Sequence, residues 1–166
     1  MITAFKLAGM FAAHAIWSVS DNGTDPMSPM FVYTQEDGQR KMIRLISDTF
    51  ESSVQKGREL LESNEMDAND GALLYDGRIT IEGTKIDAIL IAIRTYFSPG
   101  SEALLAVPYT PKKSFFSRFR VHKPKVLEWK NCDDFDVNRA LDSFWEGVDS
   151  HEQGSKVWKK ALDQSK

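Results

Sequence analysis

Cysteine is scarce in this sequence. The chain of 166 residues contains one cysteine, Cys132. A single cysteine cannot form an internal disulfide, which excludes the small disulfide-stapled folds of secreted proteins. Such a chain is typical of a reducing compartment, so the sequence predicts a cytoplasmic protein. We expect Cys132 to be a structural thiol, because no candidate base accompanies it.

Long apolar runs are also lacking. The longest stretch without Asp, Glu, Lys or Arg runs from Leu7 to Ser20 and has 14 residues, fewer than the roughly 20 that a membrane helix needs. We therefore expect no membrane span. Lys6 followed by "LAGMFAA" imitates a secretory signal, but Gly9 interrupts the apolar run and "IWSVS" after it is typical of a strand.

Known catalytic and cofactor motifs are absent. The sequence contains no G-x-x-x-x-G-K-[ST], G-x-S-x-G, G-x-G-x-x-G or H-E-x-x-H motif. Its histidines are His14, His122 and His151, and none has another His or Cys two to four positions away. The sequence thus predicts no metal site and no cofactor. His14, close to Ile16 and Trp17, is expected at the core or its rim.

The composition is that of one globular domain spanning residues 1–166. Apolar residues make up 42% of the chain and charged residues 27%, which excludes a disordered or fibrous protein. The net charge of −3 gives no general attraction to nucleic acid or to an anionic membrane.

The first half of the chain predicts strands and one helix. Residues 13–20 alternate as a strand would. "MFVYT" and "RKMIRLI" flank Asp37-Gly38, which indicates a hairpin. A helix over residues 48–63 follows, capped by Ser47 or Asp48.

Residues 72–110 predict a meander of four antiparallel strands. Asp76-Gly77 is typical of a two-residue hairpin turn, which would place Leu74 opposite Ile79. "KIDAILIAI" has apolar residues on both faces, as in a central strand. Asp87 within it needs Arg78 or Arg94 as a partner, or lies at the solvent edge.

The C-terminal part predicts two short edge strands between residues 115 and 129 and then two helices. The first helix follows Asp133, Asp134 and Asp136, and a break indicated by Gly147, Ser150 and Gly154 precedes the last helix. Together these elements predict an α+β fold with a mostly antiparallel sheet of six to eight strands, one inserted helix and a helical C-terminus.

The segment 112–130 concentrates positive charge. It holds seven Lys or Arg and one acid, leaving 14 cations and 23 acids in the rest of the chain. Cations interleaved with aromatics can bind phosphates and stack bases, which makes Arg118, Arg120, His122 and Lys123 candidate binding residues. The favoured interpretation is a solvated strand edge, with Phe116 or Phe119 and Val121 pointing inward. An anionic ligand, nucleic acid or an acidic protein partner is the alternative.

Glu128-x-Lys130 at the end of "VLEWK" has the pattern of metal-dependent nucleases, in which a carboxylate holds Mg²⁺ and a lysine steadies the attacking water. The pattern needs another acid upstream. No Asp or Glu lies between Ala103 and Leu127, so Glu102 or Asp87 would have to serve.

Without a catalytic constellation, the sequence favours a non-enzymatic binding or regulatory protein whose partner is another protein, as in toxin-neutralising inhibitors. The alternatives are a metal-dependent hydrolase or nuclease using Glu128 and Lys130, and anion or nucleic-acid binding through residues 112–130.

Overall fold

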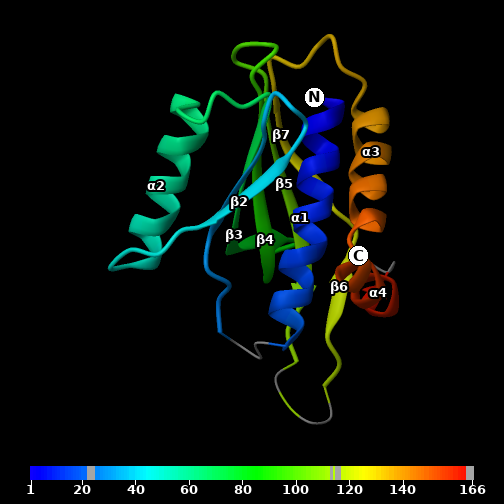
Figure 1. Ribbon diagram of the computed structural model, residues 1–166. Coiled ribbons are helices and arrows are strands. Elements are labelled where there is room, and N and C mark those ends of the chain that lie inside the picture. The colour runs from blue at the N-terminus through cyan, green and yellow to red at the C-terminus, as the bar shows by residue number, and fades with distance from the viewer. Residues whose placement is uncertain (22–24, 113, 115–116, 164–166) are drawn as a thin grey trace.

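A computed structural model describes residues 1–21, 25–112, 114 and 117–163. Within these residues the chain forms four helices and eight strands, so the expected α+β class is confirmed (Figure 1). The helices are α1 (Ile2–Asp21), α2 (Phe50–Ser63), α3 (Val137–Ser150) and α4 (Glu152–Ala161). The strands are β1 (Met30–Thr34), β2 (Arg40–Arg44), β3 (Asp70–Ile81), β4 (Thr84–Thr95), β5 (Glu102–Thr110), β6 (Arg120–His122), β7 (Lys125–Lys130) and β8 (Leu162–Asp163).

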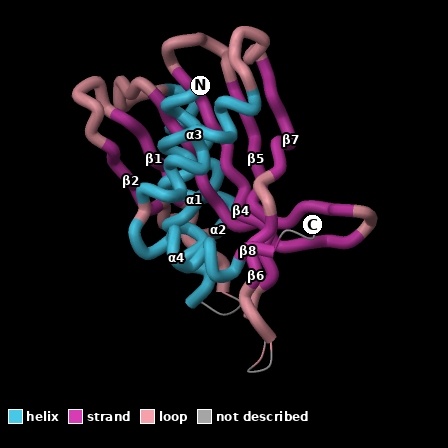
Figure 2. Tube along the Cα trace, turned by 90° about the vertical axis from the view of Figure 1, so that its right-hand side faces the viewer, coloured by secondary structure: helices cyan, strands magenta, loops and turns pink. Residues whose placement is uncertain are grey.

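The strands form one mostly antiparallel sheet. Its order is β2-β1-β3-β4-β5-β6-β8, and β7 pairs with the other part of β5. Only β6 and β8 pair in parallel among the described strands. Figure 2 shows β6 and β8 at the lower end, away from the upper part of β7. The two short strands expected between residues 115 and 129 are therefore present as β6 and β7, but of these two only β7 is an edge strand, because among the described strands β6 lies between β5 and β8.

The strand predicted at residues 13–20 is wrong, because this segment belongs to the 20-residue helix α1. Alanine, the best helix former, recurs along it. The alternation of apolar residues was mistaken for that of a strand because α1 has no single buried face: it lies between the sheet and helices α3 and α4 (Figure 1). A helix covered on several sides buries apolar residues in nearly every position.

The expected lack of a stretch long enough for a membrane span also needs correction. By length and composition alone, Ile2–Asp21 is long and apolar enough to cross a membrane, since Lys6 is its one charged residue before Asp21. In this fold, however, 56% of its most apolar window is buried. Phe5, Leu7 and Ile16 are each at most 1% exposed, within the main core. Cytoplasmic location stays a prediction.

Glycines set how closely α1 approaches α3. A Cβ at Gly147 would lie 2.1 Å from the carbonyl oxygen of Lys6, and a Cβ at Gly9 would lie 1.9 Å from that of Phe144. Distances below 3.0 Å are not tolerated between such atoms. The two backbones can therefore touch only because neither residue has a side chain.

The hairpin turn predicted at Asp76-Gly77 is also wrong. Both residues lie inside β3, and the turn to β4 is made by Glu82-Gly83, each with positive φ. Leu74 consequently pairs with Ile91 and not with Ile79. Asp76 is accommodated within the strand because Tyr109 of β5 donates a hydrogen bond to its carboxylate. Residues 70–110 thus form three long strands and not four.

The hairpin of β1 and β2 and the helices α2, α3 and α4 are of the predicted type, although details of their ends differ. Gly38 takes a positive φ between β1 and β2. Helix α2 is capped by Thr49 and not by Ser47 or Asp48. Asp136 caps α3 by accepting hydrogen bonds from the N–H groups of Asn138 and Arg139, and His151 separates α3 from α4.

The two faces of the sheet are covered unequally. Helix α1 packs on one face, with α3 and α4 behind it. Helix α2 lies on the other face, where it packs on β1 and β3 over a smaller core that includes Phe31, Leu61 and Leu73. On the α2 side of the sheet, Leu90, Ala92 and Arg94 of β4 and Glu102 and Leu104 of β5 are partly exposed, and Glu128 and Lys130 of β7 are exposed. We call this part of the sheet the open face.

Candidate functional site

A hollow of about 290 Å³ lies on the open face beside α2. Its charged lining residues come from α2, β4, β5 and β7, and we call this place the charged hollow. Those residues are Arg58, Glu62, Arg94, Glu102, Glu128 and Lys130.

Strand register brings most of these groups together. Arg94 pairs with Glu102, and Glu102 pairs with Lys130, so the three form one row across β4, β5 and β7. Two residues farther along β5, Leu104 pairs with Glu128 of β7. Because alternate residues of a strand face the same side, all of these side chains belong to the α2 side.

The charges of the hollow are largely paired with one another. The Arg94 guanidinium donates to the Glu102 carboxylate. The Lys130 ammonium lies 2.5 Å from a Glu128 oxygen, and this hydrogen bond, followed by the charge of Glu128, raises the pKa of Lys130. Three cations and three carboxylates line the hollow, so it attracts neither sign strongly.

Arg58 and Arg94 are the positioned cations of this site. Arg58 donates to the hydroxyl of Tyr75 at 2.9 Å and stacks over its ring, 5.6 Å from the centroid. The Arg94 side chain is 20% exposed, and it also donates to the carbonyl oxygen of Glu62 at 3.4 Å. Its buried Nε has no hydrogen-bond partner among the described residues. These contacts fix both guanidinium groups relative to the sheet.

Apolar side chains occupy the middle of the open face. Leu90, Ala92 and Leu104 are partly exposed there, and Ala92 and Leu104 line the hollow itself. These apolar residues, which we call the apolar centre of the open face, are bordered on the side of the charged hollow by charged side chains, which we call its rim.

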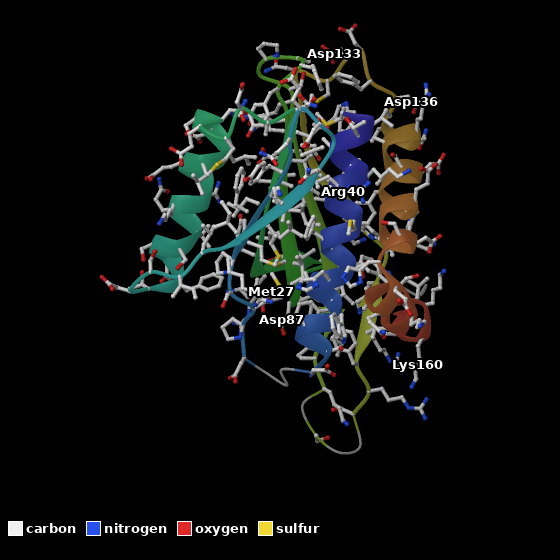
Figure 3. The ribbon with its side chains drawn as sticks, in the orientation of Figure 1. Met27, Arg40, Asp87, Asp133, Asp136 and Lys160 are labelled. Atoms are coloured by element: carbon white, nitrogen blue, oxygen red, sulfur yellow. The ribbon has the colours of Figure 1, made fainter. Side chains whose placement is uncertain are left out.

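The structure brings Glu102, Glu128 and Lys130 together in the charged hollow. Glu102 therefore lies where the nuclease pattern requires its upstream acid. Asp87 lies elsewhere: it pairs with Arg78 at 3.1 Å, and Figure 3 shows it toward the lower end of the sheet. Glu102 and Glu128 are each already paired with a cation, Arg94 and Lys130 respectively. Across the described part of the chain, no group of three or more His, Cys, Asp or Glu side chains could hold a metal ion.

The four candidate residues of the basic segment do not share one site. Arg118 lines a second hollow, at the end of α4. Arg120 pairs with Asp163 at 2.9 Å. His122 is 2% exposed, and its ring lies 3.3 Å from the Thr110 hydroxyl, while Lys123 is exposed.

The inward orientation expected of the apolar residues in this segment holds for Val121, which is fully buried. Phe119 packs against the main core, with its ring 5.9 Å from that of Tyr109, but it also lines the second hollow beside Arg118. Phe116 lies outside the described residues. A strand edge with all its apolar side chains pointing inward therefore does not describe Phe119, which also contributes to a hollow beside a cation.

Asp76 and Tyr109 form a buried polar pair on the α1 side of the sheet. The Tyr109 hydroxyl lies 2.9 and 3.0 Å from the two carboxylate oxygens, and the N–H of Met27 donates to the same group at 3.3 Å. Burial raises the pKa of Asp76. Burial and then the charge of Asp76 raise the pKa of Tyr109. The hydrogen bonds thus hold both groups in place.

His14 and His151 form a second pair, between α1 and the start of α4. The Nδ1 of His151 accepts from the N–H of Gly154 at 3.0 Å, so its Nε2 carries the proton and donates to Nδ1 of His14 at 3.2 Å. Burial, the charge of His151 and the charge of Arg44 lower the pKa of His14. His14 therefore lies at the rim of the core, where the sequence placed it.

Sequence reasoning missed Arg58, Arg94 and Lys160 as site residues. Their spacing in the sequence gives no signal, because α2 and α4 each reach their hollow only in the folded chain.

Comparisons with protein-family models, with curated proteins and with solved structures found no match to this chain.

Proposed function

We propose that this chain is a non-enzymatic binding protein whose partner is another protein, bound on the open face. The observation that carries the proposal is the apolar centre of Leu90, Ala92 and Leu104 within a rim of fixed charges. Protein interfaces have this arrangement, with an apolar middle from which charge is depleted and a polar margin.

The charge balance of the rim favours a protein over a polyanion. Because cations and carboxylates are interleaved, a partner gains by presenting both signs in a matching order, which gives specificity more than affinity. An acidic polymer would meet Glu62, Glu102 and Glu128 as well as the cations. The proposal includes an inhibitory role, in which the domain covers the partner's working surface as toxin-neutralising inhibitors do.

A matched pair of substitutions tests this proposal. Leu104→Lys puts a charge in the apolar centre, whereas Ile46→Lys makes a similar change at a position that is 80% exposed and precedes α2. Burying a leucine at an interface is worth about 1.5 to 3 kcal/mol, so Leu104→Lys should weaken the complex at least about tenfold. Partners captured from a lysate of the source organism would be identified, purified and titrated against both variants by calorimetry.

Thermal unfolding of both variants separates lost binding from lost folding. The proposal requires that Ile46→Lys bind as the unchanged protein does and that Leu104→Lys stay folded but bind weakly. A partner that binds Leu104→Lys with full affinity would show that the open face is not the docking surface.

A second candidate function is favoured by the position of Glu102. Mg²⁺ is commonly held by one or two carboxylates together with substrate phosphates. Glu102 and Glu128 lie on neighbouring strands, and Lys130 is the register partner of Glu102 and the ion-pair partner of Glu128. A metal-dependent hydrolase or nuclease would cleave DNA or RNA in the presence of Mg²⁺ and lose that activity in Glu128→Ala but not in Glu82→Ala. Absence of cleavage by the unchanged protein would reject it.

A further inference from the structure

A larger hollow, of about 710 Å³, lies at the lower end of the molecule. Its described lining residues come from the end of α1, from residues 112 and 117–119 between β5 and β6, and from α4. We call it the basic hollow. Its lining residues are Ser20, Lys112, Ser117, Arg118, Phe119, Val157, Lys160 and Ala161.

The basic hollow collects positive charge that nothing in its lining balances. Among the described residues of its lining, Lys112, Arg118 and Lys160 are cations and none is an acid, although the whole chain carries −3. Figure 3 shows Lys160 extending downward from α4, toward the segment that carries Arg118. Three like charges that share one hollow repel each other, and a bound anion removes that cost.

Three of the neighbouring acids, Asp149, Glu152 and Asp163, are already paired with other cations. Lys156 pairs with Glu152 and Lys159 pairs with Asp149, so the other two lysines of α4 have partners. Arg120 takes Asp163. Among the described residues, Lys112, Arg118 and Lys160 form no ion pair, and Asp21, next in the chain to Ser20, pairs with none of them.

The remaining walls are apolar. Phe119, Val157 and Ala161 supply a ring and aliphatic surface beside the cations. The hydroxyls of Ser20 and Ser117 donate to the carbonyl oxygens of Trp17 and Ser114, so the attraction for an anion comes from the cations. A volume of this size accommodates a small organic ligand.

We propose that the basic hollow binds a small molecule that carries phosphate groups and a ring, with the phosphates between Arg118, Lys112 and Lys160 and the ring against Phe119. Arginine bonds phosphate oxygens in pairs, and lysine adds point charge. An aromatic face next to such a cluster favours a planar ring by stacking. This site is distinct from the charged hollow, so it stands or falls independently of the proposed protein partner.

The test is calorimetric titration at low salt with three probes: pyrophosphate, adenosine 5′-diphosphate and a twelve-residue oligothymidylate. Adenosine 5′-diphosphate should bind more tightly than pyrophosphate because only the former has a ring. Arg118→Gln and Lys160→Gln should each weaken its binding by roughly tenfold, the typical effect of losing a charge-assisted hydrogen bond. Lys159→Gln is the matched control, because Lys159 is the neighbouring lysine already paired with Asp149.

Three results would overturn the proposal. The first is that neither pyrophosphate nor adenosine 5′-diphosphate binds. The second is that Lys159→Gln weakens binding as much as Lys160→Gln, which would indicate diffuse attraction. The third is that the oligothymidylate binds far more tightly than the nucleotide, with a steep salt dependence. The last result would make the segment a surface for single-stranded nucleic acid. Tighter binding of the nucleotide, lost in both hollow variants and kept in the control, supports the site.

Discussion

Replacing Gly147 by alanine should separate α1 from α3. The new Cβ would stand 2.1 Å from the carbonyl oxygen of Lys6 and 2.8 Å from the amide nitrogen of Met10, and both are backbone atoms that no rotamer change can move. Relief requires the helices to part by roughly 1 Å, since nonbonded heavy atoms pack at about 3.5 Å or more. Core packing along α1 would be lost with that shift.

The expected loss of stability follows from two opposed effects. Overpacking of this kind costs about 1 to 3 kcal/mol, and a contact with rigid backbone belongs at the upper end. Alanine in a helix interior recovers about 1 kcal/mol relative to glycine. The net loss should be about 2 kcal/mol, or a fall in Tm of roughly 4 to 8 °C for a domain of this size.

Urea and thermal unfolding followed by circular dichroism would measure the difference. Asp142→Ala is the control, because it also adds helix propensity to α3 but at an exposed position. A Gly147→Ala protein as stable as the unchanged protein would refute the close backbone contact between α1 and α3.

Two further predictions concern buried polar pairs. The folded state lowers the pKa of His14, first through burial, so the unfolded state takes up the proton more readily. The contribution of His14 to the free energy of unfolding should be fully present above about pH 6.5 and should be lost as the pH drops through the folded pKa. Urea unfolding between pH 7.5 and 5.5 should show a smaller fall in His14→Gln, and an equal fall in both proteins would contradict the assignment. Tyr109→Phe removes the hydroxyl that donates to Asp76, which should cost about 1.5 to 3 kcal/mol at pH 7. That cost should shrink near pH 4 as Asp76 takes up a proton, and a pH-independent cost would count against the pair.

The sequence predicted most of the sheet and three of the four helices because those elements carry local signals of burial. The helical stripe of α3 reports burial on a single side, and the apolar residues on both faces of β4 report a central strand. Helix α1 was missed for the opposite reason. It is covered by the sheet and by two helices, so its apolar residues show no stripe.

The hairpin at Asp76-Gly77 was mistaken because a turn signal can be overruled by tertiary contacts. Tyr109 is 33 residues away in the chain, and no local pattern reveals that it meets Asp76. Glu82-Gly83, with a weaker signal, makes the turn instead.

The candidate sites could be predicted only in part. Glu128 and Lys130 are two residues apart, so the sequence could pair them, and Glu102 could be named as the nearest upstream acid. Arg58 and Lys160 reach their hollows from helices that are remote in the chain. Which cations lack an acid partner depends on the complete fold.

Chemical labelling of lysines in the purified complex with the captured partner tests docking on the open face most directly. Lys130 lies at the rim of that face, whereas Lys156 and Lys159 lie on α4, and all three side chains are at least 60% exposed. The account predicts that the partner slows acetylation of Lys130, read by mass spectrometry, and leaves Lys156 and Lys159 reactive. Slower acetylation of Lys156 and Lys159 with Lys130 unchanged would contradict it.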